Sequence, residues 1–214
     1  MNKPLRRTAV IIGASSGIGE ALAHELNRAD WHLGLLARRL DRLETLRETL
    51  AQETVVRAFD VTQPDAAAIL EHVLDELGGV DLVIISAGTG HNAALDWELD
   101  LDTVTVNVLG FMAVAQAAMR YFLRRGSGHL VGISSVAARR GNRASAYAAS
   151  KAFQSVYLGG LRDVARHSGR LVVASPVKAA RQILRAVQKR KKHAYITRRY
   201  ALVAFILKLL PRPG

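Results

Sequence analysis

A glycine-rich turn near the start of the chain constrains the fold more than any other feature. It follows a short apolar run, Thr8–Ile12, and opens a stretch with helical spacing, residues 17–28. Gly13, Gly17 and Gly19 carry no side chains, so the chain can turn sharply and the helix can offer its first free N–H groups to an anion. The strand–turn–helix order therefore predicts a cradle for the pyrophosphate of a dinucleotide. A glycine pattern by itself is equally compatible with a plain tight turn.

Apolar runs and helical spacings alternate along the rest of the chain. Strands are expected at 8–12, 32–36, 55–59, 82–85 and 129–133, and helices at 17–28, 40–50, 64–77, 99–124 and 145–167. Short apolar strands separated by helices are typical of a parallel sheet with both faces covered. The predicted fold class is α/β with a doubly wound parallel sheet, and 214 residues suffice for one such domain rather than two.

The formal net charge of +12 comes from one end of the chain. Residues 178–214 contain 11 Lys and Arg and no Asp or Glu, whereas residues 1–177 contain 19 basic and 18 acidic residues. The excess charge is a property of the tail, so a nucleic-acid partner is not expected. The sequence has no cysteine, which excludes disulfides and thiolate metal sites, and no membrane span is expected. We therefore predict a cytoplasmic protein without a metal.

A second group of residues indicates proton transfer. Tyr147 and Lys151 are four residues apart in an expected helix and so share one face. A phenol, with a pKa near 10, is a poor base unless its anion is favoured. An ammonium about 4 Å away contributes on the order of 4 kcal/mol toward that anion at an effective dielectric of about 20. Without the glycine turn, an ordinary surface pair on a helix would be the better interpretation.

A serine after the 129–133 strand is the third candidate for this chemistry. Ser135 lies in the loop that follows the carboxyl end of this strand, and open α/β sheets bind their ligands beyond such ends. Its hydroxyl can therefore hydrogen-bond a substrate oxygen and hold it beside Tyr147. Spacing alone does not separate Ser135 from its neighbour Ser134.

The end of the second expected strand bears on the choice of cofactor. An acidic residue there would bind the adenosine ribose hydroxyls and repel a 2′-phosphate. This chain has Ala37 followed by Arg38 and Arg39. A guanidinium binds phosphate through paired hydrogen bonds and keeps its charge, which favours NADP(H) over NAD(H). Alternatively, both arginines belong to the solvated start of the next helix.

These motifs resemble those of the short-chain dehydrogenase/reductase family over most of the chain. The segment Ala14–Gly19 is similar to that family's cofactor turn, and Asp60 with Val61 is similar to the pair beside the adenine ring. Ser86-Ala87-Gly88 stands where the family usually has Asn-Ala-Gly. Asn107 resembles the asparagine that holds a water of the proton relay. Ser135 and the segment Tyr147–Lys151 resemble the catalytic serine, tyrosine and lysine.

The resemblance implies a Rossmann-type fold, a set of site residues and a quaternary structure. It assigns catalysis to Ser135, Tyr147, Lys151 and Asn107. The cofactor contacts that it implies are Gly13, Ser15, Ser16, Gly17, Ile18, Gly19, Arg38, Arg39, Asp60, Val61, Ala87, Gly88, Tyr147 and Lys151. It also suggests a homodimer or homotetramer formed through the helices at 99–124 and 145–167.

The segment after residue 167 departs from the family pattern. Family members have a sixth strand, a Pro-Gly turn, a threonine and a substrate lid here, and roughly 20 to 30 of these residues are missing by analogy. In one interpretation Leu171–Ala174 is the sixth strand; in the other, Ser175 caps a helix that begins at Pro176 and runs to about Lys189. Either the protein has no lid, or a mobile loop of the protein is missing from this sequence, and the second explanation is favoured because lids are often disordered without ligand.

The tail divides the chain into a catalytic domain, residues 1–197, and a basic, apolar C-terminal helix, residues 198–214. A last strand is expected at 193–197, and the apolar run that follows is too short to span a bilayer. We expect this helix to pack on the domain or on a partner subunit, with contact to an anionic membrane surface as the alternative.

Taken together, the motifs predict an NADP(H)-dependent oxidoreductase that reduces a carbonyl group or oxidises a secondary alcohol, with tyrosine as the acid or base. The apolar tail favours a hydrophobic substrate. A non-catalytic NADP(H)-binding regulatory or scaffold protein is the alternative.

Overall fold

We describe the protein from a computed structural model, whose described residues are 7–91, 95–139, 143–166, 170–177 and 193–195. The strands are β1 (Thr8–Ile12), β2 (His32–Ala37), β3 (Thr54–Ala58), β4 (Val80–Ile85), β5 (Ser127–Gly132), β6 (Arg170–Val177) and β7 (His193–Tyr195). The helices are α1 (Gly17–Arg28), α2 (Leu40–Glu48), α3 (Ala66–Leu77), α4 (Trp97–Val104), α5 (Phe111–Arg125) and α6 (Ser145–Arg166), with the π-helical turn η1 (Thr105–Gly110) and the 3-10 turn η2 (Val136–Arg139).

The strands form one parallel sheet in the order β3-β2-β1-β4-β5-β6-β7. The chain first builds the sheet from β1 toward β3, and it then crosses over to add β4 on the other side of β1. The strand order therefore reverses between β1 and β4. Open α/β sheets bind ligands beyond the carboxyl ends of their strands at such a reversal, and here the glycine-rich turn follows β1 at that point.

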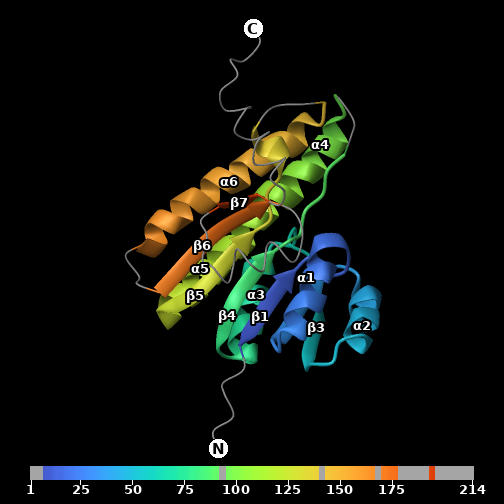
Figure 1. Cartoon of the computed structure of the whole chain (residues 1–214). Coiled ribbons are helices and arrows are strands. Elements are labelled where there is room, and N and C mark those ends of the chain that lie inside the picture. Colours follow the sequence, from blue (N-terminus) through green and yellow to red (C-terminus); the bar gives the residue numbers. More distant parts are fainter. Residues whose placement is uncertain (1–6, 92–94, 140–142, 167–169, 178–192, 196–214) are drawn as a thin grey trace, which may run out of the picture.

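Alternation of side chains along the strands gives each face of the sheet its own core. Val10 and Ile12 of β1 pack in a cluster with α3, α5 and α6. Ala9 and Ile11 of the same strand pack on the opposite face, in a cluster with α1 and α2. Figure 1 shows α5 and α6 running alongside β5 and β6, while α1 and α2 lie near β1 and β3. The doubly wound arrangement predicted from the sequence is thus confirmed.

Two predicted elements need correction. The helix expected at 99–124 is α4, η1 and α5 in succession, so that a π-helical turn interrupts it around Asn107. The interpretation in which Ser175 caps a helix is wrong, because residues 175–177 continue β6 and pair with β7. Pro176 lies past Ala174, the last residue that pairs with β5, so its missing N–H breaks no hydrogen bond to that strand. The rest of the expected 176–189 helix, residues 178–189, lies outside the described residues, as does the helix expected at 198–214.

The helical stretch Trp97–Arg125 is long and apolar enough to cross a membrane by length and composition. Phe111, Val114 and Phe122 of this stretch belong to the core, because they are almost fully buried against the sheet and α3. Half of its most apolar window is buried inside the molecule, so length and composition alone are weak evidence for a membrane span.

Candidate active site

Close packing explains the glycines of the turn after β1. Gly13 has φ +87°, and a Cβ added there would overlap the backbone of Ala87 in the loop after β4. A Cβ on Gly19 would overlap the carbonyl of Gly13, so α1 starts directly against the turn. Gly17 has φ +62° and open space around it. Glycine is thus needed at position 13 for the packing of strand on loop, at position 19 for the packing of the helix, and at position 17 for a left-handed backbone.

The side chain of Arg39 reaches across to this turn. Its Nη2 donates to the hydroxyl oxygens of Ser15, at 3.1 Å, and Ser16, at 2.9 Å. Arg38 lies beside the turn from the end of β2, and the carboxylate of Asp60 accepts hydrogen bonds from the N–H and hydroxyl of Thr62. No acidic residue follows β2 before Asp41. The Arg39 guanidinium and two hydroxyls therefore meet at this end of the site, and Arg38 lines the same end of the cavity. Such a group of donors suits a phosphate.

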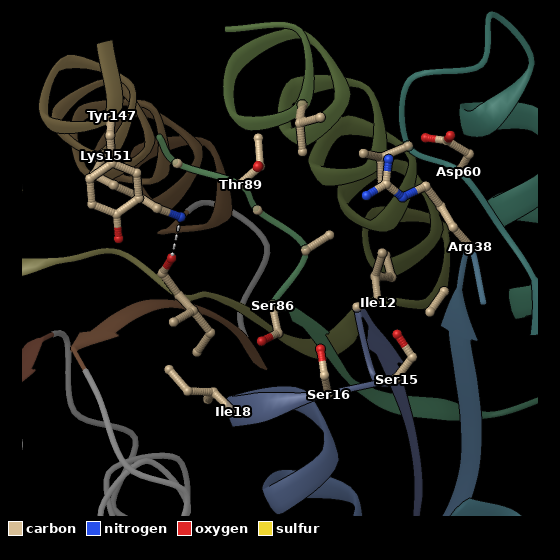
Figure 2. A pocket seen from close by; sticks show the side chains of 18 of the residues that line it. Ile12, Ser15, Ser16, Ile18, Arg38, Asp60, Ser86, Thr89, Tyr147 and Lys151 are labelled. Atoms are coloured by element: carbon tan, nitrogen blue, oxygen red, sulfur yellow. Dashed lines mark hydrogen bonds between the residues drawn. The ribbon is translucent and has the colours of Figure 1, made fainter. Parts of the chain in front are cut away.

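A cavity of about 640 Å³ runs along the carboxyl ends of the strands. Figure 2 shows Arg38 and Asp60 at one end of it and Tyr147 with Lys151 at the other, with Ser15, Ser16 and Ser86 between them. The predicted residues that line it are Gly13, Ser15, Ser16, Ile18, Arg38, Arg39, Asp60, Val61, Ala87, Gly88, Tyr147 and Lys151. The cavity joins the two motifs that the sequence places far apart.

Tyr147 and Lys151 occupy the first turns of α6 and face the loop after β4. A Cβ on Gly90 would overlap the ring of Tyr147, so the backbone of that loop lies directly on the ring. The Lys151 ammonium lies 5.8 Å from the centre of the same ring. Lys151 is 5% exposed, and this burial lowers the pKa of its ammonium from 10.5 to about 8. The two groups lie close together, as their spacing predicts.

The two adjacent serines after β5 have different partners. The Ser134 hydroxyl bonds the backbone oxygen of Lys151, at 3.0 Å, and the hydroxyl of Ser155, at 2.7 Å, so it ties the loop to α6. The Ser135 hydroxyl accepts the N–H of Ala137, at 3.2 Å, at the start of η2. Ser134 lines the cavity, although its hydroxyl is engaged with α6. The catalytic role of Ser135 stays a prediction, and its hydroxyl proton has no partner assigned among the described residues.

Asn107 connects the loop after β4 to α6. Its side chain accepts from the N–H of Thr89 at 2.9 Å, and it donates to the oxygen of Thr89 at 2.7 Å and to the Ser150 hydroxyl at 3.0 Å. Its backbone oxygen accepts a hydrogen bond of 2.9 Å from the amide of Gln154. The π-helical turn gives Asn107 this central position, and such turns are frequent at functional sites. Asn107 lies behind the cavity wall rather than in its lining.

Sequence reasoning missed several residues of this site. Gln154 is 1% exposed and contacts both Lys151 and Asn107. His91 lines the cavity, and its Nε2 lies 2.9 Å from a carboxylate oxygen of Asp102 in α4. A glutamine three residues after the lysine was a usable signal, because a polar residue on the buried face of an apolar helix requires partners. His91 stands in a loop and carried no such signal.

Known proteins resemble this chain in sequence and in fold. The model of a family described as short chain dehydrogenase matches residues 7–191. An uncharacterized oxidoreductase from Myxococcus xanthus is 40% identical over 171 residues, covering 76% of this chain and 68% of that protein. Another from Mycobacterium tuberculosis is 37% identical over 159 residues, covering 69% of this chain and 62% of that protein. The matched region thus spans about two thirds of these relatives.

Solved structures agree at the level of the fold. A short-chain dehydrogenase from Sphingobium yanoikuyae, in complex with NADPH, has a TM-score of 0.79 and 23% sequence identity, covering 97% of both chains. The likeness in backbone extends through the sheet and its covering helices.

Proposed function

The chain belongs to the short-chain dehydrogenase family and is an oxidoreductase, and we propose that it transfers a hydride between NADP(H) and the carbonyl or secondary alcohol of a small substrate. The observation that carries this proposal is the single cavity that joins the glycine turn and Arg38 with Arg39 to Tyr147 and Lys151. The NADPH complex of the Sphingobium yanoikuyae relative supports the choice of cofactor.

The residues present fit a phosphorylated dinucleotide. The backbone at Gly17 is open, because no atom lies within 4 Å of where a Cβ would stand. A Cβ on Gly88 would lie 3.1 Å from both the Lys151 ammonium and the Asn107 side chain. A larger residue at this position would therefore crowd the lysine. Arg38, Arg39 and the two serines would hold the adenosine phosphate, and Tyr147 with Lys151 would border the nicotinamide end.

The cofactor would supply or accept the hydride, and the protein's own residues would manage the proton. Tyr147 would donate its hydroxyl proton to the carbonyl oxygen in reduction and take it back in oxidation. The positive charge of Lys151 favours the phenolate that forms when the proton leaves. Ser135 would hydrogen-bond the same substrate oxygen and hold it next to the phenol. The buried position of Lys151 makes its charge more effective than it would be in water.

Screening for NADPH consumption tests the proposal as a whole. Aldehydes, ketones and 3-oxoacyl thioesters are offered in turn, and the absorbance of NADPH is followed with wild type and with Tyr147→Phe. Wild type should reduce at least one of these carbonyl classes, and Tyr147→Phe should not. NADPH binding without turnover of any carbonyl would favour the non-catalytic scaffold instead.

Removing the Arg39 guanidinium is expected to weaken NADPH binding and leave NADH binding almost unchanged. Charge-assisted hydrogen bonds to a phosphate are worth about 1.5–3 kcal/mol, so Arg39→Ala should raise the Kd for NADPH about 10- to 100-fold. Arg42→Ala is the matched control, because Arg42 lies on α2 just beyond Arg39 and does not line the cavity. Fluorescence titration with both nucleotides measures the effect, and an equal loss for NADPH and NADH would contradict the phosphate role.

Reduction is expected to slow as pH rises through about 8, the pKa to which burial lowers the Lys151 ammonium. The measurement is kcat/KM for NADPH against pH, which reports groups of the free enzyme. The pKa of Lys151 is about 8 in the folded protein and 10.5 in the unfolded chain. Between these pH values the unfolded chain binds more protons than the folded protein, so the contribution of Lys151 to stability rises with pH there. A fall in rate above pH 8 therefore cannot come from unfolding driven by Lys151. A rate that stays flat to pH 10 would contradict the role of the charge.

The remaining proposals concern the setting of the enzyme. We propose a cytoplasmic homodimer or homotetramer, on the strength of the family. The tail 198–214 is proposed to pack on the domain or on a partner subunit rather than on a membrane. Sedimentation of the full chain and of a chain truncated after residue 197, each with and without anionic vesicles, tests both points.

A further inference from the structure

One buried amide joins the lysine of the site to the helix that carries Asn107. Gln154 lies on α6, one turn beyond Lys151, and is 1% exposed. Its Oε1 accepts a hydrogen bond of 3.0 Å from the Lys151 ammonium, and its Nε2 donates one of 2.9 Å to the backbone oxygen of Asn107. The link therefore runs from α6 to the π-helical turn through a single side chain.

The chemistry of the two partners fixes the orientation of this amide. An ammonium has only donors and a backbone carbonyl has only acceptors, so the oxygen must face Lys151 and the nitrogen must face Asn107. Among side chains of this length, only glutamine offers an acceptor and a donor at once without taking up a proton. A glutamate would place a second oxygen against the carbonyl, and a methionine would leave both partners without their bonds.

The environment of Lys151 makes this acceptor matter. The ammonium also donates to the backbone oxygen of Ile133, at 3.1 Å, which Figure 2 marks with a dashed line. Neither described acceptor is charged, and burial disfavours the ammonium. The titratable groups that line the same cavity are Tyr147 on α6, His91 with its partner Asp102 on α4, and Asp60, Arg38 and Arg39 at the far end.

We propose that Gln154 is a positioning residue that holds the Lys151 ammonium beside Tyr147 and favours its protonated form. A neutral amide does not release its proton in the working pH range, so Gln154 anchors the lysine rather than carrying protons to Asn107. The effect on Lys151 is a property of the folded protein; its consequence for the rate rests on the proposed function.

Titration of Lys151 by NMR tests the anchor without requiring turnover. The full-length protein is labelled with ¹³C at lysine, the Lys151 Cε signal is assigned by its loss in Lys151→Arg, and its shift is followed against pH. Gln154→Met is expected to lower the pKa of Lys151 by about one unit, because a hydrogen bond to the charged form is lost. Gln154→Glu is expected to raise it, because a carboxylate replaces a neutral oxygen.

A glutamine elsewhere in the structure provides the matched control. Gln116 lies on α5 and donates to the Tyr157 hydroxyl, away from the cavity, so Gln116→Met should leave the Lys151 titration unchanged. A Lys151 titration that is the same in wild type and in Gln154→Glu would overturn the proposal, and this variant decides even if Gln154→Met does not fold.

Kinetics then separate the anchor from the proposed function. Once a substrate is known, Gln154→Met should lower kcat about tenfold near pH 8, with little change in the substrate KM, and move the alkaline fall in rate to lower pH. A shifted Lys151 titration with unchanged kinetics would keep the anchor and contradict the catalytic use of Lys151. Unchanged titration with full activity would remove the anchor and leave the proposed function standing.

Discussion

Tyr147→Phe is expected to reduce turnover about a thousandfold or more and to leave NADPH binding within about twofold of wild type. General acid–base catalysis by a positioned side chain contributes about 10²- to 10⁴-fold, and the phenol is the only proton donor that the proposed mechanism uses. The substitution keeps the ring that packs against the backbone at Gly90 and lies near Lys151. Loss of activity would therefore report the missing hydroxyl rather than a collapsed cavity.

A second tyrosine on the same helix makes a direct control. Tyr157 lies ten residues further along α6, where its hydroxyl accepts a hydrogen bond from Gln116 and its ring stacks on Phe153. It does not line the cavity. Steady-state rates and NADPH titrations of Tyr147→Phe and Tyr157→Phe, measured together, isolate the effect of position. Substantial turnover in Tyr147→Phe would assign the proton to another group, and His91 is the next titratable candidate in the lining.

Much of this fold was predictable because local patterns and tertiary structure agree. The strand 82–85 is apolar throughout and the strand 8–12 is apolar after Thr8, and both are buried on two faces in the centre of the sheet. The helix 17–28 was predicted with its observed bounds, because the turn glycines mark its start and its apolar face is regular.

The predictions that failed did so because contacts between residues distant in sequence override local patterns. No pattern in 99–124 marks the π-helical turn, which depends on contacts that Asn107 makes with the distant residues Thr89 and Ser150. Ser175 and Pro176 have local preferences for a helix start, yet pairing with β7 overrides them.

The candidate site shows the same division. Residue types that carry chemistry by themselves, such as Tyr147, Lys151 and Arg39, could be proposed from spacing and from resemblance. The sequence signals that Gln154, a polar residue on the buried face of α6, needs partners, but it does not say which ones. Only the packing of α6 against η1 brings Gln154 to the carbonyl of Asn107 as well as to Lys151. The choice between Ser134 and Ser135 likewise depends on which hydroxyl α6 engages, and the neighbouring residues alone do not determine that.

Gly13→Ala is expected to cost about 3 kcal/mol or more in stability, whereas Gly17→Ala should fold and bind NADPH more weakly. Both glycines have positive φ, which costs an alanine about 1–2 kcal/mol. A Cβ at Gly13 also overlaps the backbone of Ala87, and the strand–loop packing there cannot relax without moving β4. Gly17 has no such neighbour, so its added methyl would meet open space between Ser16 and Ile18, which both line the cavity. Urea unfolding should separate the first variant from the second.

Gly126 supplies the control that separates backbone strain from cofactor exclusion. It has a left-handed backbone with φ +70° and no atom within 4 Å of an added Cβ, and it ends α5 outside the cavity lining. Gly126→Ala and Gly17→Ala should therefore lose similar stability, within about 0.5 kcal/mol of each other. Only Gly17→Ala should weaken NADPH binding, by at least about tenfold, because an added methyl that pushes the ligand out of van der Waals contact costs about 1.4 kcal/mol or more. If Gly17→Ala binds NADPH as tightly as Gly126→Ala does, the glycine turn serves packing alone and the dinucleotide must lie elsewhere in the cavity.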